Sequence, residues 1–229
     1  MNNLLLKPTA SSDAHERALS EASSPSNGQV LSSCVSALLL FVVSPFLLMI
    51  AAAILIESGS PVLFTQERVG RNGILFRLLK FRTMRQGKAG PPITARGDAR
   101  ITRVGKFLRE FKLDELPQLW NVVRGDMSLV GPRPEVPQFV DSSPLWQSVL
   151  RVRPGITDPA SIAYRNEEEL LAKAADPIRF YQESVLPAKL ALNLAYLNKR
   201  TPWLDFKVIV RTARCAMFPG ASGSKERGV

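Results

Sequence analysis

The sequence is poor in the residues on which many hydrolases and zinc enzymes depend. Its 229 residues include a single histidine, His15. This scarcity excludes a Ser-His-Asp triad, a Cys-His pair and a zinc site built on histidine, so carboxylates remain as the natural nucleophiles or general bases. Only two cysteines are present, Cys34 and Cys215, so the sequence has no disulfide framework and does not require an oxidising compartment.

Tryptophan and tyrosine are also scarce, with three residues of each. The net charge of +10 would suit a nucleic-acid partner, but the basic residues are not interleaved with aromatic side chains that stack on bases. We therefore expect no nucleic acid. Beside a hydrophobic segment, anionic membrane lipid and phosphate-bearing substrates are the expected partners.

One long hydrophobic segment dominates the first quarter of the chain. The 22 residues from Val35 to Ile56 carry no charge, and a straight helix of that length would reach about 33 Å, enough to cross a membrane. Pro45, which follows Ser44 at the middle, removes a backbone hydrogen bond and bends such a helix. The residues alone favour a kinked spanning helix and leave open one that enters the membrane and returns. All but two of the 30 lysines and arginines follow Ile56, so the basic portion is expected in the cytoplasm.

Composition divides the chain into four parts. Residues 1–28 and 219–229 are predicted to be mobile tails, 29–58 to form the membrane segment, and 59–218 to form one folded domain. Within that domain, glycines and β-branched residues predict two short strands joined by a turn between Ser60 and Met84. The next predicted elements are a loop at 87–97, helices at 103–112 and 117–124, and a strand at 127–130.

The last part of the domain is predicted to form helices with apolar stripes. The first stripe consists of Leu190, Leu194 and Leu197, opposite Lys189, Asn193, Tyr196 and Arg200. The second consists of Trp203, Phe206, Val210, Ala213 and Met217, opposite Lys207, Arg211 and Arg214. Such a stripe suits packing in a core, and equally suits a helix lying in the headgroup layer of an anionic membrane.

Two adjacent carboxylates, Asp114 and Glu115, stand just before the proline that begins a predicted helix. The positive end of a helix dipole keeps carboxylates ionised and attracts phosphate, so this is a suitable place for phosphate chemistry. The alternative is that the two acids only satisfy the helix end.

Basic residues are dense around this acidic pair. Residues 68–112 include 13 lysines and arginines but only two acids, a density that requires solvent, lipid or bound anions. Arg133 lies between Pro132 and Pro134, which restrict the backbone and reduce the entropy lost when a guanidinium binds phosphate. The residues expected to form an anion cradle are Lys80, Arg82, Arg109 and Arg133.

Three runs of residues together resemble one known family. They are KFRTM at 80–84, DARITRVGKFLREFKLDELPQLWNVVRGDMSLVGPRPE at 98–135 and RPGITDPASI at 153–162. They resemble the bacterial sugar transferases known as monotopic phosphoglycosyl transferases, over roughly residues 44–162. The resemblance implies transfer of a sugar 1-phosphate from a UDP-sugar to polyprenyl (undecaprenyl) phosphate with release of UMP. This would be the first step of exopolysaccharide, capsule, O-antigen or glycoprotein glycan synthesis.

The resemblance also implies roles for individual residues. The Asp-Glu pair of the family falls on Asp114 and Glu115, which makes Asp114 the covalent nucleophile and places Mg²⁺ at Glu115. Mg²⁺ prefers few carboxylates together with phosphate oxygens and water, which suits one Glu and a diphosphate. The motifs add Arg151 and Arg153 to the predicted substrate-binding residues.

In this family the Ser-Pro pair breaks a re-entrant helix, so the resemblance reverses the preference for a spanning helix. It implies a helix-rich α/β fold: a re-entrant membrane hairpin broken at Ser44 and Pro45, and a small catalytic domain with short strands and interfacial amphipathic helices. That domain would lie on the cytoplasmic face of the bacterial inner membrane. One stretch departs from the family, because GQVLSS at 28–33 replaces a Lys-Arg pair and a following Asp.

A homo-oligomer and downstream glycosyltransferases are left open as partners beside the UDP-sugar, the polyprenyl phosphate and membrane lipid. The alternative function is a non-catalytic basic module on the membrane that binds anionic lipid or a glycan-assembly protein. Such a module would have no need for two carboxylates before a helix or for an arginine held between prolines.

Overall fold

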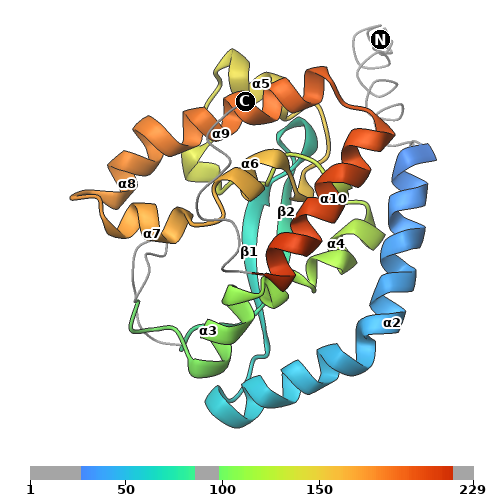
Figure 1. The fold of residues 1–229 in the computed structure, drawn as a ribbon, viewed down its shortest axis with the longest axis vertical. Coiled ribbons are helices and arrows are strands. Elements are labelled where there is room, and N and C mark those ends of the chain that lie inside the picture. Colours follow the sequence, from blue (N-terminus) through green and yellow to red (C-terminus); the bar gives the residue numbers. More distant parts are fainter. Residues whose placement is uncertain (1–26, 86–97, 219–229) are drawn as a thin grey trace, which may run out of the picture.

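A computed structural model describes residues 27–85 and 98–218 (Figure 1). The predicted loop at 87–97, the tail 219–229, nearly all of the tail 1–28 and His15 lie outside the described residues. The helices are α2 (Asn27–Ser58), α3 (Arg103–Glu110), α4 (Gln118–Arg124), α5 (Pro144–Val149), α6 (Pro159–Ala163), α7 (Glu167–Ala172), α8 (Pro177–Phe180), α9 (Leu186–Asn198) and α10 (Pro202–Met217). The strands are β1 (Leu63–Val69), β2 (Leu75–Phe81), β3 (Ser128–Val130) and β4 (Gly155–Thr157). The predicted helix-rich α/β class is confirmed.

The two strands predicted between Ser60 and Met84 are the antiparallel pair β1 and β2. Asn72 and Gly73 form the turn between them, both with positive φ, which glycine adopts without strain and asparagine tolerates. The predicted helix after the acidic pair is α4, and Gly125 ends it in the left-handed conformation as expected. It begins one residue later than predicted, because Pro117 is its N-cap.

The side chain of Asn121, on α4, takes the place of a strand along the free edge of β2. Its amide oxygen accepts from the Leu79 N–H at 3.0 Å, and its amide nitrogen donates to the Arg77 carbonyl at 2.8 Å. Asn121 is fully buried, so no water can replace these bonds. The contact holds β2, which carries Lys80, against the helix that follows Asp114.

We therefore expect Asn121→Leu to lower the free energy of unfolding by about 2–4 kcal/mol, because it leaves a buried N–H and a buried C=O without partners. Urea denaturation would measure the change. Asn198→Leu, at an exposed position on α9, is the matched control and should change stability little. Equal effects of the two substitutions would show that the Asn121 side chain does not stabilise the edge of β2.

The parallel pair β3 and β4 joins two of the motifs. A Cβ atom built on Gly155 would lie 2.1 Å from the Gly131 nitrogen, so only glycine permits this approach. The contact brings the turn after β3, which contains Arg133, beside the chain that leads into α6. Beyond it, the largest hydrophobic cluster packs α5, α7 and α9 around Trp146, Leu171 and Leu186.

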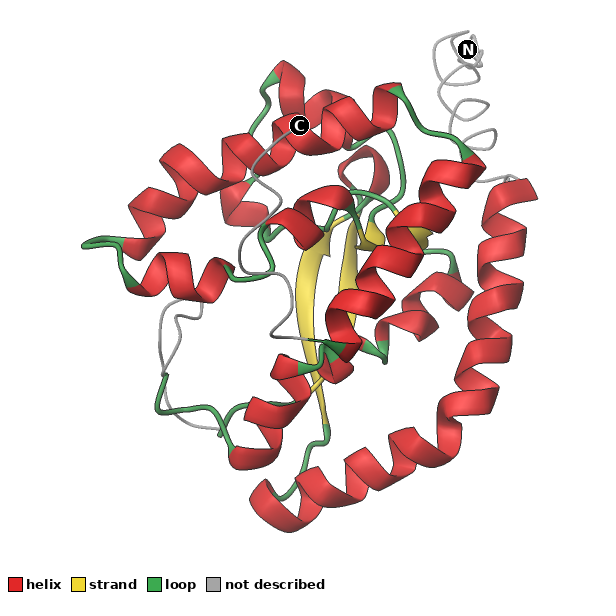
Figure 2. Ribbon diagram, in the orientation of Figure 1, coloured by secondary structure: helices red, strands yellow, loops and turns green. Residues whose placement is uncertain are grey.

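The apolar segment forms a single helix, α2, that bends near its middle (Figure 2). Pro45 cannot donate to the Phe41 carbonyl, and the Ser44 hydroxyl donates to that carbonyl instead, at 2.8 Å. The middle of the helix is exposed; Phe41, for example, is 79% exposed. Both ends contact the folded domain, α4 near the N-terminal end and the β2 and α3 region near the C-terminal end.

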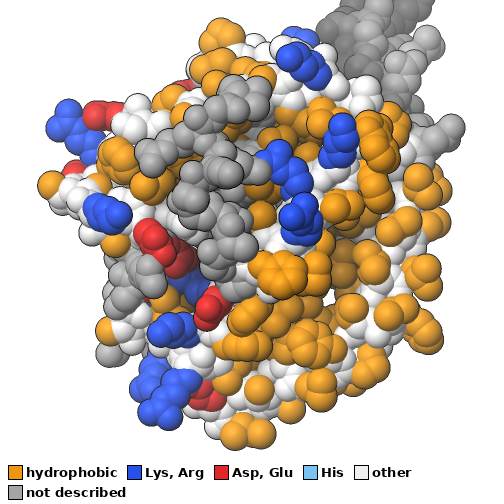
Figure 3. Space-filling view, in the orientation of Figure 1, with side chains coloured by type: hydrophobic (Ala, Val, Ile, Leu, Met, Phe, Trp, Pro, Cys, Tyr) orange, Lys and Arg blue, Asp and Glu red, His pale blue; other side chains and the backbone are white. Residues whose placement is uncertain are grey.

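The two predicted amphipathic helices differ in their surroundings. Lys189, Asn193 and Tyr196 on α9 are buried, so the expected polar face of this helix points into the protein. The helix therefore belongs to the core. On α10 the apolar side is exposed: Trp203 and Met217 are 63% and 61% exposed. Figure 3 shows hydrophobic side chains gathered over the side of the molecule formed by α2 and the adjoining part of α10, with basic side chains among them.

Candidate active site

The structure contains a cavity of about 410 Å³. One part of its wall is the turn that contains Asp114 and Glu115, and other parts are formed by helices α6, α7, α9 and α10. Five of the predicted site residues line it, namely Lys80, Arg109, Asp114, Glu115 and Arg133. They come from β2, α3, the segment before α4 and the turn after β3. The fold therefore brings together residues that are up to 53 positions apart in the sequence.

The acidic pair occupies a 3-10 turn, Leu113–Glu115, rather than the first turn of α4. Lys112 precedes it in the left-handed conformation and redirects the chain after α3. Asp114 is 7% exposed, and its Oδ1 has no hydrogen-bond partner among the described residues. A buried carboxylate oxygen without a partner is costly, which is typical of a group retained for chemistry rather than for stability.

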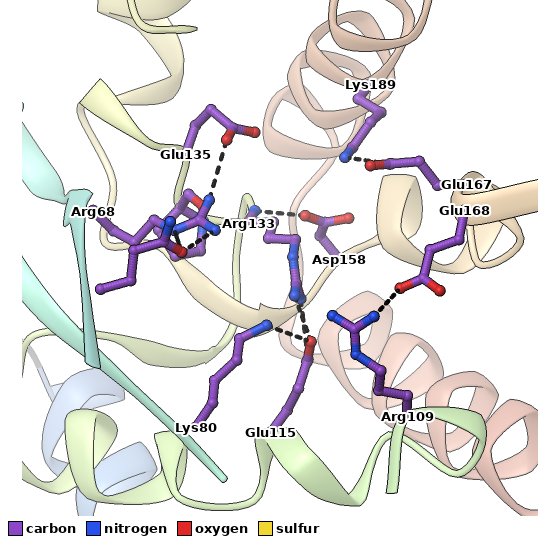
Figure 4. Close-up of polar contacts among 12 residues, drawn as sticks. Arg68, Lys80, Arg109, Glu115, Arg133, Glu135, Asp158, Glu167, Glu168 and Lys189 are labelled. Carbon is purple, nitrogen blue, oxygen red and sulfur yellow. Dashed lines mark hydrogen bonds and ion pairs between the residues drawn. The ribbon is translucent and has the colours of Figure 1, made fainter. Parts of the chain in front are cut away.

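Glu115 points the other way, toward two cations (Figure 4). Its Oε1 lies 3.1 Å from the Lys80 Nζ, and its Oε2 accepts from Arg133 Nη1 at 3.0 Å. Arg133 Nη2 also donates to Oε1, so the arginine holds both carboxylate oxygens in a fork. The two neighbouring acids therefore have different surroundings.

These surroundings shift the pKa values of the two acids in opposite directions. Burial raises the pKa of Asp114, and the attraction of Lys80 offsets this only in part. Burial would also raise the pKa of Glu115, but Arg133 and Lys80 outweigh it and hold that pKa well below its usual range. The pKa of Asp114 is thus raised, whereas a position at a helix end was expected to favour its ionised form. For Glu115, the charge is stabilised by its two basic neighbours.

Arg133 is positioned through its backbone as well as its side chain. The Arg133 N–H donates to Asp158 Oδ2 at 2.6 Å. Asp158 is fully buried and caps the start of α6, where its Oδ1 also accepts from the Ser161 N–H in the first turn. The same turn is held further along by Glu135, which bonds Arg68 and the Tyr181 hydroxyl. Sequence reasoning missed Asp158, although an Asp before a Pro is a recognised helix-start signal.

Two further ion pairs close the opposite wall of the cavity. The Arg109 Nη1 lies 3.2 Å from the Glu168 Oε1, and the Nζ of Lys189, on α9, lies 2.8 Å from the Glu167 Oε2 (Figure 4). Sequence reasoning did not select Glu167, Glu168 or Lys189. Lys189 was assigned to a polar helix face, and nothing in the local pattern indicates that this face is turned inward.

The structure does not bring the other predicted basic residues to the cavity. Arg82 is buried, and its Nη2 donates to the carbonyls of Ser58 and Gly59 at 2.9 and 2.6 Å, so it ties down the end of α2. Arg153 donates from Nε to the Gly125 carbonyl at 3.0 Å, and the Arg151 carbonyl accepts from Arg71. Alternation along a strand placed Arg82 and Lys80 on one face, but that face extends beyond the site.

The described residues contain no cluster of three or more His, Cys, Asp or Glu side chains that would hold a metal ion. Any metal at this site would need ligands from the substrate as well as from the protein. Glu115 has both oxygens engaged by cations, while Asp114 retains a carboxylate oxygen without a partner.

Comparison with known proteins identifies the family of the chain. A model of the family described as bacterial sugar transferase matches residues 27–219. The chain is 38% identical over 191 residues to the UDP-glucose:undecaprenyl-phosphate glucose-1-phosphate transferase of Caulobacter vibrioides, covering 80% of this chain and 67% of that protein. It is 38% identical over 193 residues to the UDP-N-acetylgalactosamine-undecaprenyl-phosphate N-acetylgalactosaminephosphotransferase of Aeromonas hydrophila, covering 82% of this chain and 42% of that protein.

A third relative is the UDP-glucose:undecaprenyl-phosphate glucose-1-phosphate transferase of Escherichia coli, 35% identical over 188 residues, which cover 78% of this chain and 37% of that protein. The chain thus spans about two thirds of one of these relatives and less than half of the other two. The match to the family model extends from the start of α2 to beyond the end of α10, and so includes every residue of the cavity. This chain belongs to the bacterial sugar transferase family.

Proposed function

We propose that the protein transfers a sugar 1-phosphate from a UDP-sugar to polyprenyl (undecaprenyl) phosphate and releases UMP, as the first step in building a surface glycan. The observation that carries this proposal is the unpartnered, buried oxygen of Asp114 in a cavity lined with cations. The relatives from Caulobacter vibrioides and Aeromonas hydrophila are named for undecaprenyl phosphate and for different sugars, so the sugar class is left open.

In the first step an oxygen of Asp114 attacks the phosphorus that bears the sugar. The bond from that phosphorus to the bridging oxygen breaks, and the oxygen leaves with its electron pair as part of UMP. The sugar phosphate is then attached to Asp114 as an acyl phosphate. Lys80, Arg109 and Arg133 line the same cavity, where their charges would stabilise the negative charge on the phosphoryl oxygens and the leaving group.

In the second step a phosphate oxygen of the polyprenyl phosphate attacks the same phosphorus. The bond to Asp114 breaks, the carboxylate is restored, and the product is a polyprenyl diphosphate sugar. Neither step requires a general base, because a carboxylate and a phosphate each react in the ionised form. Two steps also allow one site to use two phosphate substrates that would repel each other if they were bound together.

Mg²⁺ fits this site as an ion shared between the protein and the substrate. Each carboxylate oxygen has a second lone pair, so Glu115 or Asp114 would supply one or two ligands, and diphosphate oxygens and water the others. When bound, the ion would neutralise charge on the diphosphate. Binding of the diphosphate would also draw Lys80 and Arg133 toward phosphate and free the oxygens of Glu115.

Glu115→Gln is expected to raise the Mg²⁺ concentration needed for half-maximal activity about tenfold, because an amide is a weaker ligand than a carboxylate. Titration of the rate with Mg²⁺ would measure the shift. Binding of Mn²⁺ to the protein with a UDP-sugar, followed by electron paramagnetic resonance, gives a readout that does not depend on turnover. Unchanged metal dependence in both would exclude Glu115 as a ligand.

We also propose that α2 re-enters the membrane on the cytoplasmic side of the bacterial inner membrane. Gly28–Ser58 is long and apolar enough to cross a membrane, but each arm on either side of the bend has only about ten apolar residues, or about 15 Å. Contacts of both ends of α2 with one folded domain support re-entry, because a spanning helix would separate those ends by the bilayer. The exposed apolar side of α10 suits the headgroup layer.

Pro45→Ala is expected to favour a straight, spanning α2, because alanine restores the missing backbone hydrogen bond. A cysteine introduced at Ser12, with Cys34 and Cys215 replaced, would report the position of the preceding segment in intact cells. We expect protection from a membrane-impermeant thiol reagent in the parent and labelling in the Pro45→Ala variant. Labelling of the parent from outside would exclude the re-entrant topology.

The activity is tested by incubating the full chain in lipid vesicles with a panel of UDP-sugars and polyprenyl phosphate. When the lipid phosphate is present at substrate levels, we expect one UDP-sugar to yield UMP in an amount equal to the lipid-linked sugar formed. Without the lipid phosphate, UMP release should stop after a single turnover. The non-catalytic alternative predicts lipid binding without UMP. Absence of UMP with every UDP-sugar would overturn the proposed function.

A further inference from the structure

Gln29 is a polar residue buried in an otherwise exposed part of α2. It is 6% exposed, whereas the neighbouring Val30 and Leu31 are 48% and 66% exposed. Its side-chain nitrogen donates to the Met127 carbonyl at 3.1 Å and approaches the Val122 carbonyl at 3.5 Å. These bonds connect the start of the membrane helix to residues almost 100 positions away.

Ser33 adds to the same contact. Residues four apart lie on one face of a helix, and the Ser33 hydroxyl donates to the Val122 carbonyl at 2.9 Å. One turn further, Ser36 is fully buried, and its small side chain permits close packing against the folded domain. We call Gln29 and Ser33 together the α2–α4 clamp.

One acceptor of the clamp, the Val122 carbonyl, lies in the last turn of α4, and the other, the Met127 carbonyl, lies between the end of α4 and β3. The last carbonyls of a helix have no partner within it and are costly to leave unsatisfied in apolar surroundings. The Gly125 N–H donates to the Val122 carbonyl, and the Ser33 hydroxyl of the clamp supplies a second donor to it. The clamp thus has a directional, polar role that an apolar contact would not provide.

The other end of α4 leads to the site. Only Leu116 and Pro117 separate Glu115 from the first residue of α4. The clamp therefore joins the N-terminal arm of α2 to the helix that follows the acidic pair. Arg82 joins the opposite arm to the end of β2, which carries Lys80.

We propose that the α2–α4 clamp sets the height of Asp114 relative to the membrane, and that Gln29 and Ser33 are positioning residues for the step that uses the lipid substrate. They occupy the stretch 28–33 that departs from the family pattern. The inference rests on the proposed function, because it assumes a phosphate acceptor held in the bilayer. The first step uses a water-soluble UDP-sugar and does not depend on this height, whereas the second step does.

The primary test measures depth without catalysis. Trp120 lies on α4 and is 50% exposed, so its fluorescence in vesicles would be quenched by lipids brominated at different depths. The parent would carry Trp146→Phe and Trp203→Phe so that one tryptophan remains. We expect Gln29→Met with Ser33→Ala to shift or broaden the depth profile. Cys34→Ala, at an exposed neighbouring position, is the control and should leave it unchanged.

The second test separates the two steps in the chain that retains its tryptophans. In the double variant we expect the single-turnover release of UMP to stay within twofold of the parent and steady-state turnover to fall at least tenfold. Ser33→Thr, which keeps the hydroxyl donor, should retain more turnover than Ser33→Ala. If the double variant does not fold, the comparison of Ser33→Thr with Ser33→Ala tests the proposal instead.

An unchanged depth profile would overturn the proposal, and so would equal turnover of Ser33→Thr and Ser33→Ala. A parallel loss of both steps would also overturn it, because the clamp would then support only the general fold. If the parent releases no UMP, the proposed function fails, and the depth profile still decides whether the clamp positions α4.

Discussion

Asp114→Asn is expected to abolish turnover, by at least about a thousandfold, with the fold intact. The amide has the size of the carboxylate but is not a nucleophile toward phosphorus. Burial already disfavours the charge of Asp114, so a neutral side chain should leave stability unchanged or slightly higher. Single-turnover release of UMP and thermal unfolding would measure the two effects together.

The matched control is Asp141→Asn, which changes an exposed carboxylate and should leave the rate unchanged. Mass spectrometry of the parent, quenched in acid before lipid is added, should find the sugar phosphate on the peptide that contains Asp114. Near-normal rates in a folded Asp114→Asn protein would exclude the covalent role.

The direction of the pKa shift adds a pH dependence. Because burial raises the pKa of Asp114, its nucleophilic, ionised form is lost at a higher pH than for an ordinary aspartate as the pH falls. The acid limb of the first-step rate should therefore lie above the normal Asp range. A limb at or below that range would contradict the assignment of Asp114 as the group that must ionise.

Arg133→Lys is expected to lower the turnover number about a hundredfold, although the charge is kept. Lysine loses the planar fork that holds both oxygens of Glu115, and with it the geometry for a forked contact with phosphate. The buried Glu115 would lose the fork and keep Lys80 as its cationic partner, so we also expect a limited loss of thermal stability.

Steady-state kinetics with varied UDP-sugar, together with a melting curve, would separate the catalytic effect from the structural one. Arg179→Lys, at an exposed position with a helix-surface ion pair, is the control. Wild-type kinetics from Arg133→Ala would show that the guanidinium contributes only surface charge.

Local patterns predicted the elements around the site well. Glycine-bounded β-branched residues gave the strands β1 and β2, and a proline followed by Gly125 marked the two ends of α4, because these signals act through the backbone of neighbouring residues. The hydroxyl of Ser44 bonds the carbonyl that Pro45 leaves free, as its position one residue away predicts.

Predictions that depended on distant partners were less complete. Alternation placed Arg82 beside Lys80, but Arg82 turns to the end of α2, which lies more than 20 positions earlier in the chain. The helical pattern places Lys189 opposite an apolar stripe, yet Lys189 lines the cavity and pairs there with Glu167. Neither pairing has a signature within a local window.

The sequence by itself determined that carboxylates are the natural nucleophiles, that basic residues are dense around one such pair, and that an apolar helix carries a proline at its middle. These conclusions follow from composition and neighbours. Only the tertiary structure decided the difference between Asp114 and Glu115, because burial and the approach of Lys80 and Arg133 arise from packing distant segments together. It also decided how α2 is held, because Gln29 finds its acceptors only where the end of α4 lies beside the start of α2.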